Sequence, residues 1–114
     1  KYLELIKEHP PARLESEGAL PEELWKGLKE IGIFGLNIPE AYGGAGRPLT
    51  QYLKVVEVMS GTDLALAIIP IAHLSIGVKG ILVFGNEDQK KRYLPRAASG
   101  EMIFAYALTE PKFG

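Results

Sequence analysis

The stretch Leu64–Phe84 constrains the fold more than any other part of the chain. It reads LALAIIPIAHLSIGVKGILVF and is apolar on all sides, with His73 and Lys79 inside it. A helix that is apolar all round must be surrounded by other elements or by lipid. The two polar side chains weaken a membrane-spanning interpretation, and no flanking basic or aromatic belt supports it. We therefore expect the buried central helix of a soluble helical domain, bent or broken at its proline or its glycines.

Composition narrows the class of protein without identifying it. The chain has 114 residues, which suggests one domain or part of one, and 46% of them are hydrophobic. A formal net charge of −1 gives no reason to expect nucleic acid as a partner. The absence of cysteine excludes disulfides, a thiol nucleophile and a cysteine-bound metal. Because the chain begins at Lys1 and stops at Gly114 without an end signal, we expect a piece of a longer protein.

Amphipathic patterns predict further helices on both sides of the central one. Apolar residues recur at helical spacing, and prolines or glycines stand at the ends of the segments. One start is marked by Asn86 and Gln89, which form a capping-box pattern. The glycine- and proline-bearing segments at 11–19 and 33–48 are predicted to be connections. The predicted helices are a short one from Tyr2 that ends before Pro10, one from Pro21 to Gly32, one over Leu49–Ser60, and one from Glu87 to Pro95 with another turn to Gly100.

The pattern changes after Glu101. The run MIFAYAL follows a glycine, is rich in aromatic and β-forming residues, and predicts a strand over Met102–Thr109. A lone strand cannot satisfy its own backbone groups, so its partners must lie in a β domain outside this chain. The predicted fold class is all-α. It consists of a helical bundle domain around the central helix at 1–100 and the first strand of a truncated β domain at 101–114.

Three features invite a functional interpretation. The loop Gly43–Pro48 is glycine-rich but lacks the Gly-Lys-Ser/Thr of a phosphate loop, which favours a turn with positive φ. His73 is either a hydrogen-bonded core histidine or a pocket wall, and it lacks a second metal ligand at helical spacing. The segment Tyr106–Pro111 is a strand end whose backbone N–H groups and Thr109 hydroxyl could bind the polar edge of a planar heterocycle. It could also be an ordinary strand-to-turn junction.

Three stretches together resemble the acyl-CoA dehydrogenase family. They are LPEELWKGLKEIGIFGLNIPEAYGG at 20–44, SIGVKGILVFGNEDQKKRYLPRAASGE at 75–101 and YALTEP at 106–111. The run AHLSIGVKGILVFG is most similar to the very-long-chain branch. In that family a helical N-terminal domain precedes a β domain and a helical bundle, and FAD and the acyl thioester lie between them. The family motif continues after TEP with two variable residues and Gly-Ser-Asp; here the chain ends at its Gly.

The resemblance implies a role for several residues. Tyr106, Leu108 and Thr109 would lie along FAD, with the Leu108 N–H and the Thr109 hydroxyl at the pyrimidine edge. The central helix would line the acyl channel. Glu110 is not the catalytic base, which in the family comes from the later helical domain. This chain is therefore expected to hold no catalytic residue and to be inactive alone. We also expect no metal site in it. The channel-lining side chains would be Ile68, Ile69, Ala72 and Ile76.

The small side chain of Ala72 bears on specificity. Medium-chain relatives carry a larger polar residue there, so an alanine predicts a long-chain preference; the alternative is that another helix packs closely against it.

The same resemblance implies partners and a location for the parent protein. The substrate would be a fatty acyl-CoA undergoing α,β-dehydrogenation in β-oxidation, and the electron acceptor an electron-transfer flavoprotein. The parent would be a homo-oligomer. It would lie in the mitochondrial matrix or at the inner membrane if eukaryotic, and in the cytoplasm if bacterial. The alternative is a non-enzymatic helical interaction module that keeps the fold without the chemistry.

Overall fold

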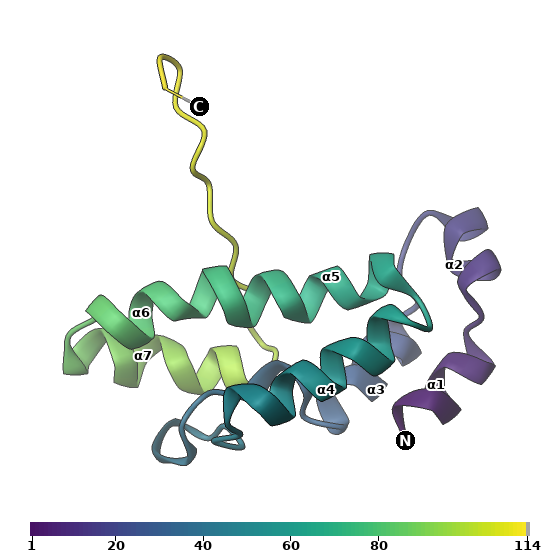
Figure 1. Cartoon of the computed structure of the whole chain (residues 1–114), viewed down its shortest axis with the longest axis horizontal. Coiled ribbons are helices and arrows are strands. Elements are labelled where there is room, and N and C mark those ends of the chain that lie inside the picture. The colour runs from purple at the N-terminus through teal and green to yellow at the C-terminus, as the bar shows by residue number, and fades with distance from the viewer. Residues whose placement is uncertain (114) are drawn as a thin grey trace.

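The computed structural model describes residues 1–113 and confirms the all-α fold class. Helices make up the body, and the described residues contain no strand. Figure 1 shows the long helix formed by α5 and α6 lying above α4 and α7, with α1 and α2 at one end. The elements are α1 (Tyr2–Glu8), α2 (Pro11–Glu17), α3 (Glu22–Glu30), η1 (Ile33–Gly35), η2 (Glu40–Tyr42), α4 (Leu49–Ser60), α5 (Leu64–Ala72), η3 (His73–Gly77), α6 (Val78–Phe84) and α7 (Glu87–Ala98).

The predicted central helix is present, but it is buried on one side only. Elements α5, η3 and α6 form one continuous helix of 21 residues. Leu66, Leu74 and Val78 on its inner side are buried, whereas Ile68 and Ile76 remain 54% exposed. The expectation of burial all round is therefore wrong for this chain by itself. The helix is long and apolar enough to cross a membrane, a test that core helices of soluble proteins also pass.

The expected break of the central helix is absent and the bend stays a prediction; the helix instead contains a π turn. Residues His73–Gly77 adopt this wider helix, and the chain continues into α6 without interruption. Pro70 lies one turn earlier inside α5, where it has no backbone N–H to donate. In the same region the Ser75 hydroxyl donates to the Ile71 carbonyl at 2.5 Å. Such π turns occur frequently at functional sites.

Two apolar clusters form the core, one under each half of the central helix. Phe34, Leu28 and Leu66 belong to the cluster under α5, and Leu74 and Leu94 to the cluster under η3 and α6. Helix α4 spans both, because it buries Met59 in the first and Tyr52 in the second. Leu49 and Leu53 of α4 remain exposed, so only part of its apolar surface is buried.

Helix α2 occupies the segment that we expected to be a connection. Pro11 stands at its first position, where a fixed φ favours a helix start, and Gly18 ends it in the left-handed conformation with φ 65°. Leu14 is buried in the first cluster, and Arg13 pairs with Glu17 at 2.7 Å one turn later. The prediction failed because the two glutamates and the glycine made a short helix look like a polar linker.

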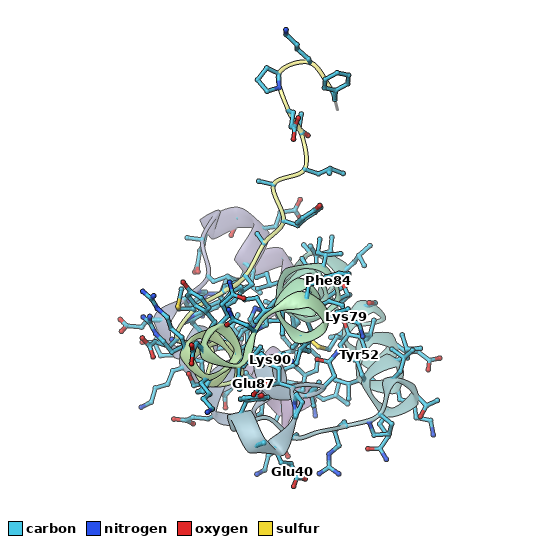
Figure 2. The ribbon with its side chains drawn as sticks, turned by 90° about the vertical axis from the view of Figure 1, so that its left-hand side faces the viewer. Glu40, Tyr52, Lys79, Phe84, Glu87 and Lys90 are labelled. Carbon is cyan, nitrogen blue, oxygen red and sulfur yellow. The ribbon has the colours of Figure 1, made fainter. Side chains whose placement is uncertain are left out.

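The connection after α3 folds back on itself through two short 3₁₀ turns. The N–H of Ala45 donates to Gly35 at 2.8 Å and that of Gly46 donates to Ile38 at 2.9 Å. Gly43 has φ 81° and Gly46 has φ 58°, so the glycines provide the turn that the sequence favoured over a phosphate loop. The loop lies at the base of the molecule; Glu40 in η2 is at the end opposite the tail in Figure 2.

Helix α7 begins with the capping box read from the sequence. The Asn86 side chain accepts from the Gln89 N–H at 2.9 Å, and the Gln89 side chain accepts from the Asn86 N–H at 2.9 Å. Glu87 in the first turn pairs with Lys90 at 3.4 Å, and Figure 2 shows the two side chains side by side. The helix passes through Pro95 to Ala98, which includes the additional turn that we expected.

The segment after α7, here called the tail (residues 101–113), leaves the helical body. It rises away from the long helix as an extended chain in Figure 1. No strand partner for it exists in the described residues, so the strand over Met102–Thr109 and the second domain at 101–114 stay predictions. The glycine of the family motif, Gly114, lies outside the described residues.

Candidate functional site

A groove on the outer side of the central helix brings two of the predicted binding positions together. It has a volume of about 340 Å³ and lies between η3, α6 and the tail. Ile76 comes from the predicted acyl channel and Tyr106 from the predicted flavin segment. We call this the outer groove; its lining residues are Ser75, Ile76, Lys79, Gly80, Val83, Phe84 and Tyr106.

The surface of the outer groove is mainly apolar. Phe84 is 88% exposed, and Val83 beside it is also exposed. Lys79 is the only charged residue in the lining. Figure 2 shows Phe84 and Lys79 on the central helix, apart from Glu87 and Lys90 of α7. Contiguous exposed apolar surface is typical of ligand-binding grooves and of interfaces.

The four predicted channel residues do not share one environment. Ile68 and Ile76 are more than half exposed on the outer side, and Ala72 between them is partly buried. Ile69 instead packs against the core cluster under α5. In a helix, positions 68, 72 and 76 line one side and 69 is turned by about 100°. Ile68, Ala72 and Ile76 therefore lie along the outer side of the helix, and of the three only Ile76 lines the outer groove, whereas Ile69 packs against the core.

The three predicted flavin contacts all lie on the exposed part of the tail. Tyr106 is 63% and Leu108 is 65% exposed, and Thr109 is exposed as well. Within residues 1–113 neither the Leu108 N–H nor the Thr109 hydroxyl has a hydrogen-bond partner. These donors are thus free to bind an acceptor from outside the chain. Glu110, on the same segment, is exposed and contributes to no group of metal ligands in the described residues.

His73 is a buried ionisable side chain that contacts the start of the tail. Its Nδ1 accepts a hydrogen bond from the Phe104 N–H at 3.0 Å, and its Nε2 lies 3.2 Å from the Ala97 carbonyl oxygen. An acceptor at Nδ1 and a donor at Nε2 define the neutral ring with its proton on Nε2. Burial lowers the pKa of His73, which keeps the ring neutral near pH 7. It is the hydrogen-bonded core histidine, and no pattern in the sequence indicated its bond to the tail.

Gly77 and aromatic rings surround the same point of the tail. A Cβ on residue 77 would lie 2.6 Å from the carbonyl carbon of Phe104, so only glycine admits the tail there. The Phe104 ring lies 5.9 Å from the His73 ring and 6.3 Å from the Tyr93 ring. The His73 ring also meets Phe34 edge-on at 5.7 Å. The tail is therefore held firmly at Phe104, immediately before the segment with the free donors.

These features define a helical domain that presents an apolar groove and a free backbone segment to something beyond itself. Residues 4–101 match the family model of the acyl-CoA dehydrogenase N-terminal domain. The chain is 48% identical to the human mitochondrial very long-chain specific acyl-CoA dehydrogenase over 104 residues, which are 91% of this chain and 16% of that protein. The chain belongs to the acyl-CoA dehydrogenase family and corresponds to its N-terminal domain.

Solved structures agree with the assignment. An acyl-CoA dehydrogenase from Bacillus anthracis, complexed with FAD, matches at a TM-score of 0.73 and 40% identity over 98% of this chain and 18% of its own. A structure described as the electron transferring flavoprotein of Acidaminococcus fermentans matches at 0.84 and 31% identity over 99% of this chain and 30% of its own. The chain thus spans between about a sixth and a third of the length of these proteins.

Proposed function

We propose that this chain is the N-terminal domain of an FAD-dependent acyl-CoA dehydrogenase that carries out α,β-dehydrogenation of fatty acyl-CoA. The observation that carries the proposal is the outer groove, where Ile76 and Tyr106 line one hollow. A position assigned to the acyl tail thus lies beside a position assigned to the flavin. Family membership supports the reaction, because the relatives that share this domain are named for it.

The outer side of the central helix would bind the acyl tail. Ile68 and Ile76 expose apolar surface there, and each methylene of an alkyl chain buried against it contributes about 0.8 kcal/mol. Ala72 lies between them and leaves space that a larger side chain would fill. We expect a preference for long acyl chains, in keeping with the very long-chain specificity named for the human relative.

The tail would bind FAD through its free donors. A flavin pyrimidine edge offers carbonyl and nitrogen acceptors, which the Leu108 N–H and the Thr109 hydroxyl match in kind. Tyr106 would stand beside the same ring. Bound FAD would supply the acceptor for the β-hydride of the substrate. The carboxylate that removes the α-proton would come from outside this chain, so the chain alone is expected to be inactive.

The parent protein would pass its electrons to an electron-transfer flavoprotein and would be a homo-oligomer. Both statements rest on membership in the acyl-CoA dehydrogenase family. A mitochondrial relative and a bacterial one leave two locations open. We propose the mitochondrial matrix or inner membrane for a eukaryotic source and the cytoplasm for a bacterial one.

Purification of the full-length parent protein tests the function. We expect a yellow protein with flavin absorbance that oxidises acyl-CoA in the presence of an artificial electron acceptor, with the 114-residue chain as the inactive control. A colourless full-length protein that oxidises no acyl-CoA of any length would instead indicate the non-enzymatic helical module.

A further inference from the structure

The direction of the free segment is determined at Phe104. Before this residue the tail is tied to α7, where the Met102 N–H donates to the Arg96 carbonyl at 3.1 Å. The last tie is the hydrogen bond from the Phe104 N–H to His73. From Ala105 to Thr109 no hydrogen bond joins the tail to any described residue. The orientation of the Leu108 N–H and the Thr109 hydroxyl relative to the helical body therefore depends on the hydrogen bond between Phe104 and His73.

The His73 side chain, which accepts this hydrogen bond, is held by several other contacts. The His73 ring is fully buried, and its other nitrogen contacts the Ala97 carbonyl of α7. It sits in the π turn, directly before the residues that line the outer groove, and it packs between the Phe34 and Phe104 rings. One rigid ring thus links three elements: the central helix, the end of α7 and the start of the tail.

We propose that His73 is a positioning residue for the flavin-binding segment. Its Nδ1 holds the main chain at Phe104 and so sets the place where Tyr106, Leu108 and Thr109 meet the cofactor. This inference rests on the proposed function, because it assigns the segment to FAD. It adds a role for a buried histidine that is itself neither a predicted cofactor contact nor part of the outer groove lining.

The two nitrogens of His73 can be separated by a matched pair of variants. Asparagine places an amide oxygen at the position of Nδ1, so His73→Asn retains the acceptor for the Phe104 N–H and loses the bond to Ala97. Glutamine places its amide near Nε2, so His73→Gln retains the bond to Ala97 and loses the acceptor for Phe104. Each variant replaces the buried ring and loses one of its two hydrogen bonds. The two variants are therefore expected to lower the melting temperature by similar amounts.

The tie itself is tested in the 114-residue chain. Nitrogen-15 shifts of the wild-type ring should show the proton on Nε2, and a proton on Nδ1 would overturn the inference. Hydrogen exchange at the Phe104 amide should be slow in wild type and in His73→Asn, and about two- to tenfold faster in His73→Gln, the range expected for one lost hydrogen bond. Equal exchange rates of the Phe104 amide in both variants would contradict the hydrogen bond between Phe104 and His73.

The consequence for the cofactor is tested in the full-length protein. We expect FAD to bind about two- to tenfold more weakly in His73→Gln than in His73→Asn, although both have similar melting temperatures. Equal losses in the two variants would mean that His73 is a core residue only. If the wild-type protein binds no FAD, the proposed function fails, while the exchange measurement at Phe104 still decides the tie.

Discussion

Phe104 lies over Gly77 so closely that a methyl group on residue 77 would stand 2.6 Å from the Phe104 carbonyl carbon. Nonbonded carbons do not approach to that distance, so either the tail or the π turn would have to shift. The new atom would meet the main chain and the Cβ of Phe104, which cannot move aside as the end of a flexible side chain could. The glycine is therefore needed for the route of the tail and not for the formation of the helix.

Gly77→Ala is expected to destabilise the chain by about 1–3 kcal/mol, the usual cost of an inserted methylene group in a packed site. Gly80→Ala is the matched control, because a Cβ at Gly80 meets nothing within 4 Å. That change should stabilise helix α6 by about 0.5–1 kcal/mol through lower backbone entropy in the unfolded chain. Urea unfolding of both variants measures the difference. Similar behaviour of the two variants would show that the tail does not pass over residue 77.

The His73 ring predicts a pH dependence of stability. Burial lowers its pKa below the ordinary value of 6.5, so the unfolded chain binds the proton more readily than the folded one. The stability that depends on the neutral His73 ring is fully present above pH 6.5. As the pH falls below this value, the free energy of unfolding decreases by at most about 1.4 kcal/mol per pH unit. The surrounding residues Phe34, Ala97 and Phe104 carry no charge.

Chemical denaturation between pH 7.5 and 5 measures this dependence. His73→Asn is the control, since it removes the titrating ring while His9 and every acidic residue remain. The slope of the free energy of unfolding against pH in this window should become smaller in the variant. Wild-type stability that rises as the pH falls would contradict the neutral buried ring.

Sequence patterns located most of the helices because local signals determine where they begin and end. The capping box of Asn86 and Gln89 and the glycine after Ser60 mark α7 and α4 at the residues where the structure has them. Helix α2 was missed because its one buried residue, Leu14, gives no periodic pattern over seven residues.

The candidate site was less predictable, because it depends on contacts between distant residues. The family motif identified Tyr106, but only the folded chain shows it beside Ile76 in the outer groove. The tie between His73 and Phe104 joins residues 31 apart in the sequence, and no spacing rule indicates it. Burial of the central helix was overestimated because Ile68, Ile76 and Phe84 on its outer side are left more than half exposed by the described residues.

Thr109→Ala tests the assignment of the tail to the flavin. In the full-length protein we expect FAD affinity to fall or the flavin potential to shift, by about 0.5–1.5 kcal/mol for one lost hydrogen bond. The side chain is exposed and unpaired among the described residues, so the melting temperature of the helical domain should not change. Thr109→Ser keeps the hydroxyl and should behave as wild type. Unchanged affinity, potential and rate in Thr109→Ala would remove this residue from the site.

Ala72→Leu tests whether the outer side of the central helix sets the acyl length. Ala72 lies between Ile68 and Ile76 and is partly buried, so a leucine would project into the space proposed for the alkyl chain. In the full-length protein kcat/KM should fall for long acyl chains and hold for short ones. Each methylene that no longer fits costs about 0.8 kcal/mol, or roughly fourfold.

Ile69→Leu is the control for Ala72→Leu, because Ile69 packs against the core cluster under α5 and the change conserves volume. It is expected to cost less than about 1.5 kcal/mol of stability and to leave the acyl-length profile as it is. If Ala72→Leu lowers kcat/KM by the same factor at every length and also lowers the melting temperature, then Ala72 is small because the core requires it, and chain length is set elsewhere.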